Sequence, residues 1–86
     1  MPKTWEFTLN DALRLENILE QIWEDVFDGE FPDGENIADI TNMTPTQIFD
    51  FAQTLVENQA AWPEKYIGLR TRLEDFLGYH AVWEDE

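Results

Sequence analysis

Residues 15–28 of the chain read LENILEQIWEDVFD, and this stretch carries two patterns that both fit one α-helix. Apolar residues recur in it at the three- and four-residue spacing of a buried helix face. They are Leu15, Ile18, Leu19, Ile22, Trp23, Val26 and Phe27. Carboxylates recur at four-residue spacing, as Glu16, Glu20, Glu24 and Asp28. One face of this helix therefore needs a hydrophobic core, while another carries only negative charge.

The row of carboxylates is unfavourable for the helix that carries it. Residues four apart lie one above the other on a helix, so each neighbouring pair of like charges costs roughly 0.2–0.5 kcal/mol. No Lys or Arg occurs from Leu15 through Glu64 to relieve this repulsion. We interpret the row as a candidate interaction surface. The alternative is a strongly solvated face that only keeps a small protein in solution.

Length and composition predict one folded domain that spans residues 1–86. Nineteen acidic and five basic residues give the chain a formal net charge of −14. Its 43% of hydrophobic and 14% of aromatic residues are enough for a core, which disordered acidic chains lack. So large a negative charge opposes binding to nucleic acids and to anionic membranes, and it favours encounter with basic protein surfaces.

The inventory of reactive side chains argues against an enzyme. The chain has no Cys, no Ser and a single His, so most nucleophile–base pairs and thiolate or imidazole metal sites cannot be assembled. A catalytic pair of carboxylates stays open only as a minor alternative. We expect no cofactor and no metal, and we expect His80 to be a surface or packing residue. No stretch is apolar enough for a signal sequence or a membrane span, so we expect a cytoplasmic protein.

Three helices are predicted, near residues 10–28, 45–61 and 63–77. Thr8 or Asn10 provides the N-cap of the first helix, and Gly29 its left-handed end. The second helix begins at Thr44-Pro45-Thr46-Gln47, which has the form of a capping box with Pro at the first helical position. The third begins at Pro63, because the residue before a Pro avoids helical geometry.

The two chain ends predict a short β pairing. Polar and apolar residues alternate over Thr4–Thr8, which is typical of a half-buried strand. Gly78 is the predicted end of the third helix, and the apolar tail Tyr79–Trp83 then docks as a strand beside Trp5 and Phe7. The predicted fold class is mainly α, a small three-helix bundle-like domain, with α+β as the form that includes this pairing.

Residues 29–43 are predicted to be a long loop between the first two helices. Ile37 and Ile40 are expected to pin it to the core through a helical turn or a short extended piece. The loop does not fit an EF-hand, because a motif with Gly34 at position 6 puts Gly29 and Ile40 at ligand positions 1 and 12. A weak, non-standard cation site is left open. The loop adds four acids to the negative surface: Glu30, Asp33, Glu35 and Asp39.

These observations favour a small acidic protein that inhibits or regulates a larger protein by occupying a basic, nucleic-acid-binding site. In composition the chain resembles the DNA- or RNA-mimicking inhibitors by which phages and mobile elements block restriction or CRISPR enzymes. We expect the partner to be a nucleic-acid-handling protein, with no direct contact to nucleic acid or membrane. The predicted partner-binding residues are Glu16, Glu20, Glu24, Asp25, Asp28, Glu30, Asp33, Glu35 and Asp39.

The alternative function is a protein–protein interaction module that docks through aromatic side chains, such as an antitoxin- or immunity-like protein or a small homodimer. Four Trp, six Phe and two Tyr are more aromatic residues than a three-helix core of this size obviously needs. Ionic strength separates the two functions, because charge-based binding weakens steeply with salt and aromatic docking does not.

Overall fold

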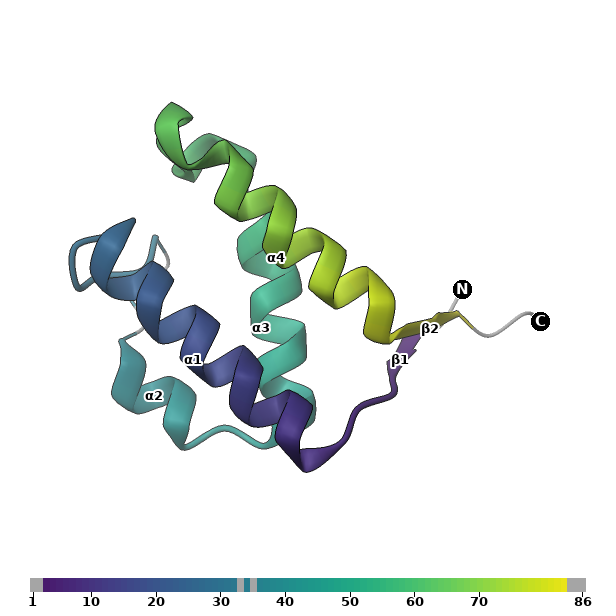
Figure 1. Cartoon of the computed structure of the whole chain (residues 1–86). Coiled ribbons are helices and arrows are strands. Elements are labelled where there is room, and N and C mark those ends of the chain that lie inside the picture. Colours follow the sequence, from purple (N-terminus) through teal and green to yellow (C-terminus); the bar gives the residue numbers. More distant parts are fainter. Residues whose placement is uncertain (1–2, 33, 35, 84–86) are drawn as a thin grey trace.

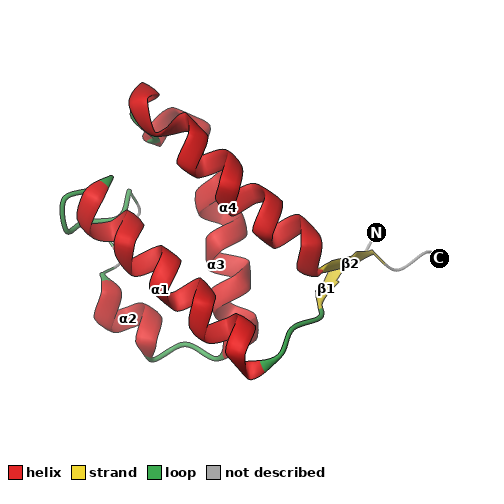
Figure 2. Ribbon diagram, in the orientation of Figure 1, coloured by secondary structure: helices red, strands yellow, loops and turns green. Residues whose placement is uncertain are grey.

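Helices dominate the chain, and its two ends meet in a small sheet (Figures 1 and 2). The computed structural model describes residues 3–32, 34 and 36–83. Over these residues the helices are α1 (Leu9–Asp25), α2 (Ile37–Thr41), α3 (Pro45–Glu57) and α4 (Ile67–His80). Short 3₁₀ turns occur at Gln59–Ala61 and Glu64–Tyr66, and the strands are β1 (Lys3–Trp5) and β2 (Ala81–Trp83). The predicted mainly α fold with paired chain ends is confirmed.

Helix α3 is the centre of the arrangement. It packs against both α1 and α4, while α2 packs against α1 (Figure 1). The apolar stripes of all these helices face one core, to which α1 contributes Leu15, Leu19 and Ile22. The remaining fully buried side chains of the core include Phe31, Ile40, Phe49, Ala52, Val56, Leu73 and Leu77. Helices α3 and α4, which correspond to the predicted second and third helices, pack against each other.

Three of the helices begin with the same device, a reciprocal capping box. At the start of α1 the Thr8 hydroxyl accepts a hydrogen bond from the Asp11 N–H (3.2 Å), and the Asp11 carboxylate accepts one from the Thr8 N–H (3.0 Å). Each box satisfies two backbone donors that would otherwise lack partners. The other two boxes pair Asn36 with Asp39 in α2 and Thr44 with Gln47 in α3. Thr8, rather than Asn10, is therefore the first N-cap.

The end of α1 differs from the prediction. The helix ends at Asp25, three residues earlier than expected. Asp28 and Gly29 both have positive φ, 52° and 89°, so the left-handed end predicted at Gly29 is present but already involves Asp28. The ring of Phe27 packs against the rings of Phe31 and Trp62, which turns the chain back toward the core. The predicted helix over residues 10–28 is thus too long.

The predicted second and third helices also need correction. Helix α3 ends at Glu57, and α4 starts only at Ile67, because Trp62 is extended before Pro63 and the intervening chain forms only 3₁₀ turns. The predicted stop at Gly78 is wrong. This residue is not among the glycines with positive φ, and α4 continues through it to His80.

The sheet joins the two chain ends in antiparallel register. Lys3 pairs with Trp83, and Trp5 pairs with Ala81. Tyr79 and His80, which were predicted to belong to the tail strand, are the last residues of α4, so helix and strand follow each other without a loop. The expected helical turn around Ile37 and Ile40 is the short helix α2, in which Ile40 is buried.

Candidate functional site

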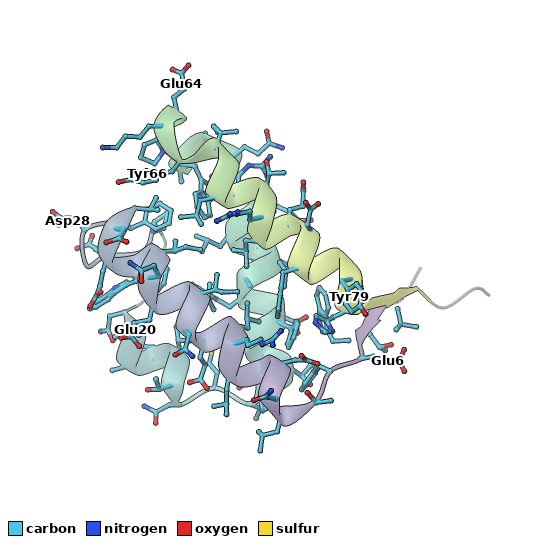
Figure 3. The ribbon with its side chains drawn as sticks, viewed as in Figure 1. Glu6, Glu20, Asp28, Glu64, Tyr66 and Tyr79 are labelled. Carbon is cyan, nitrogen blue, oxygen red and sulfur yellow. The ribbon has the colours of Figure 1, made fainter. Side chains whose placement is uncertain are left out.

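The exposed carboxylates of α1 form the site that the sequence predicts most strongly. We call Glu16, Glu20 and Glu24 the acidic row. They follow one another at four-residue steps on one helix, which is a rise of about 6 Å per step. Glu20 and Glu24 are exposed, and Glu16 is half-buried. Asp28, the predicted fourth member, is exposed in the turn beyond the end of α1 rather than on the helix (Figure 3).

The other predicted partner-binding residues have different surroundings. Asp25 is exposed, and its carboxylate accepts a hydrogen bond from the side-chain amide of Gln21. Glu30 is exposed in the loop that follows α1. The carboxylate of Asp39 accepts the N–H of Asn36 at 3.1 Å in the capping box of α2, so this residue has a structural role. Two further predicted residues, Asp33 and Glu35, lie outside the described residues.

The acidic row has no basic residue on the C-terminal part of its own helix. Arg14, near the start of α1, is the one base in that helix, and no base lies in its last turn. Glu24 and Asp25 therefore lie at the helix end whose dipole is negative, where acids are unfavourable. Among the described residues, Arg70 and Glu74 form an ion pair (3.7 Å), and Nδ1 of His80 lies 4.0 Å from the Asp11 carboxylate.

Arg70 has a structural role that sequence reasoning missed. Its guanidinium Nη1 donates to the carbonyl oxygen of Val56 at 3.0 Å, and the side chain is only 12% exposed. The indole N–H of Trp62 donates to the neighbouring carbonyl of Leu55, also at 3.0 Å. These two bonds satisfy carbonyl groups at the C-terminal end of α3, where a cation is also favourable to the dipole. The Arg70 guanidinium also lies 3.7 Å from the Glu74 carboxylate one turn further along α4.

His80 joins the chain ends. The Glu6 N–H donates to the His80 carbonyl oxygen (2.8 Å), and Nδ1 of the His80 ring donates to the Glu6 carbonyl oxygen (2.9 Å). The ring packs against Phe76 and is buried, which makes it a packing residue and not a surface one. Hydrogen bonds from Thr8, helped by the charges of His80 and Arg14, lower the pKa of Asp11 despite its partial desolvation.

The described surface has a small hollow beside α3. A hollow of about 40 Å³ is lined by Pro32, Phe51, Thr54, Leu55 and Asn58. Small-molecule sites are usually about 300–1,000 Å³, so this hollow is too small to be one. Within residues 3–32, 34 and 36–83, no three His, Asp or Glu side chains are grouped closely enough to hold a metal ion. None of the helices described there is long and apolar enough to cross a membrane.

Most of the described aromatic side chains serve the core. Phe31, Phe49 and Trp62 are buried, and several others are partly buried against them. Tyr79 is the exception, with 86% of its surface exposed, and it lies beside the strands, far along the molecule from Asp28 (Figure 3). The surplus of aromatic residues is therefore largely absorbed by packing.

The acidic row, together with Asp25 and Asp28, is the strongest candidate site in the part of the chain that the structure describes. We call these five residues the acidic surface. It can offer several carboxylates to a basic partner from one preformed helix and the turn that follows it. Comparison of the chain with protein-family models, with curated protein sequences and with solved structures finds no match.

Proposed function

We propose that this protein is a small acidic binding protein that inhibits or regulates a nucleic-acid-handling protein by occupying its basic site. The observation that carries the proposal is the acidic row, in which a half-buried Glu16 and the exposed Glu20 and Glu24 follow one another along α1, in a stretch of sequence without Lys or Arg. Their step of about 6 Å is similar to the separation of phosphates along one strand of a nucleic acid. A site that binds phosphates through Lys and Arg can accept carboxylates in their place.

The helix that carries the row supports such mimicry. Its start is fixed by the capping box of Thr8 and Asp11, and its inner face is buried in the core. The helix that bears the carboxylates is therefore formed before binding, and less backbone entropy is lost than with a flexible acidic tail. Repulsion within the row gives a further gain, because basic groups of a partner relieve it.

The test is capture of partners on the immobilised protein, followed by elution with short duplex DNA. The protein is incubated with a nuclease-treated bacterial extract at low salt, and the eluted proteins are identified by mass spectrometry. The variant Glu16→Gln/Glu20→Gln/Glu24→Gln tests the row. The control variant, Glu6→Gln/Glu57→Gln/Asp75→Asn, removes the same number of charges from exposed positions elsewhere.

We expect the wild-type protein and the control variant to capture a nucleic-acid-binding protein that DNA elutes and that high salt releases. The row variant should lose it. If both variants capture it equally, the row is a solubility feature and the proposal is wrong. Capture that resists salt and DNA would instead favour the module that docks through apolar or aromatic side chains.

A further inference from the structure

We propose that the partner which accepts the acidic row also holds Leu9 and Leu13 in an apolar contact, and that the complete docking element is the outer face of α1. The partner segment that fits this face is a basic amphipathic helix. The inference rests on the proposed function and specifies the chemistry of the partner. Its starting point is the exposure of two large apolar side chains, 72% for Leu9 and 50% for Leu13.

The two leucines and the acidic row lie on one line. Steps of four, three, four and four residues lead from Leu9 to Leu13, Glu16, Glu20 and Glu24, and such steps follow one side of a helix. The buried residues of α1 (Ala12, Leu15, Leu19 and Ile22) lie on a different side of it. The outer face is thus apolar at its N-terminal end and acidic toward its C-terminal end.

The apolar end of this face lies in the capped first turns of α1. Leu9 is the first residue of α1, directly after the N-cap Thr8, whose hydroxyl accepts the N–H of Asp11. Scattered apolar residues on a surface are ordinary, but Leu9 and Leu13 are neighbours four residues apart and form one small patch. Helical partners contact such faces through side chains at three- and four-residue spacing, and the side chains of this face have the same spacing.

Charge decides which occupant fits. A second copy of this chain would bring another acidic row close to the first, and Arg14 is the one base that α1 could offer against it. Nucleic acids and anionic membranes are repelled by the net charge of −14. A helix with leucine-like side chains on one side and Lys or Arg around them matches both ends of the face.

The test uses two synthetic peptides as probes. One is a 14-residue amphipathic peptide of Lys and Leu, and the other has every Leu replaced by Ala at the same charge. Binding is measured by isothermal titration calorimetry in low and high salt. The variant Leu9→Gln/Leu13→Gln removes the apolar end, and Ile67→Gln is the control, because Ile67 is an exposed apolar residue (42%) on another helix. Circular dichroism verifies that each variant is folded.

We expect Leu9→Gln/Leu13→Gln to weaken binding of the Lys/Leu peptide at least tenfold at both salt concentrations, with little effect on the Lys/Ala peptide. Ile67→Gln should behave like the wild type. The inference is overturned if the leucine variant binds the Lys/Leu peptide normally, or if Ile67→Gln loses as much. It is equally overturned if sedimentation shows a dimer that the leucine variant abolishes.

The row variant separates this inference from the proposed function. Glu16→Gln/Glu20→Gln/Glu24→Gln should weaken both peptides, chiefly at low salt. If it does so while the leucine variant is unaffected, only the inference fails. If the row variant binds both peptides as tightly as the wild type, both the inference and the proposed function fail.

Discussion

His80 replaces a backbone hydrogen-bond donor with a side chain. Because Trp5 pairs with Ala81, Glu6 and His80 are the next pair along the antiparallel ladder. The N–H of Glu6 reaches the carbonyl oxygen of His80, as the ladder requires. The N–H of His80, however, belongs to the last turn of α4. Its imidazole Nδ1 therefore donates to Glu6 instead, which lets α4 pass directly into β2.

A substitution that removes this donor should destabilise the fold. His80→Leu fills the buried position with an apolar side chain but leaves the Glu6 carbonyl without its imidazole donor, so we expect a loss of about 1–2 kcal/mol in the free energy of unfolding. His80→Asn retains an N–H donor near the Nδ1 position and should lose less. Urea unfolding of the three proteins measures the difference. Equal losses in both variants would mean that ring packing, rather than the hydrogen bond, is what matters.

The Asp11 carboxylate makes stability depend on pH. The folded state lowers its pKa below the ordinary value of 3.8, first through the hydrogen bonds from Thr8. A lowered pKa in the folded state contributes stability above pH 3.8, and this contribution disappears as the pH falls through the folded value. Asp11→Asn should therefore be less stable than the wild type at pH 7, and the gap should close as the pH falls through the lowered pKa of Asp11. A gap that is independent of pH would assign the loss to the cap geometry alone.

At the level of the elements, α3 depends on other parts of the chain for its C-terminal end. No basic residue lies in its last turn, and Arg70 of α4 bonds to the Val56 carbonyl in its place. Arg70→Met keeps the apolar stem and removes this donor, so we expect a loss of about 1–3 kcal/mol in the free energy of unfolding. Arg72→Met, at an exposed position of the same helix, is the control and should change stability little. A similar loss in both variants would contradict the capping role.

The starts of α1 and α3 could be predicted because their signals are local, whereas α4, which has no side-chain cap, starts four residues later than predicted. Thr8 and Thr44 lie within three residues of their capping partners, and the apolar stripes repeat within each helix. Helix ends depend on distant contacts. Just beyond the end of α1, Phe27 packs on Trp62, and no spacing in residues 15–28 predicts that contact. The same holds for Arg70, whose partner Val56 is fourteen residues away.

The residues of the candidate site could likewise be predicted only where their signal is local. The acidic row follows from the periodicity of α1, whereas Asp28 was placed on the helix only because the helix was predicted too long. Asp39 was assigned to a partner, although a local capping box uses its carboxylate. Leu9 and Leu13 precede the stretch on which the prediction was based, and their exposure depends on where α3 covers α1. Periodicity identifies a face, and tertiary packing decides which of its residues stay exposed.

Over the whole molecule, the net charge of −14 makes the folded state repel itself. Added salt screens this repulsion, since the Debye length falls from about 30 Å at 0.01 M to about 3 Å at 1 M. We therefore expect the urea midpoint of the wild type to rise with NaCl. The row contains two stacked pairs, Glu16 with Glu20 and Glu20 with Glu24, which together cost about 0.4–1 kcal/mol at low salt.

Glu16→Gln/Glu20→Gln/Glu24→Gln should therefore be more stable than the wild type by about 0.4–1 kcal/mol at low salt, and the advantage should shrink as NaCl is added. The control Glu6→Gln/Glu57→Gln/Asp75→Asn removes the same charge from positions that are not stacked on one another, so its advantage should be smaller. Urea unfolding at several salt concentrations measures the gain in stability of each variant over the wild type. A row variant that unfolds more easily than the wild type would show that these carboxylates stabilise the fold, and a surface selected for binding would no longer be needed to explain them.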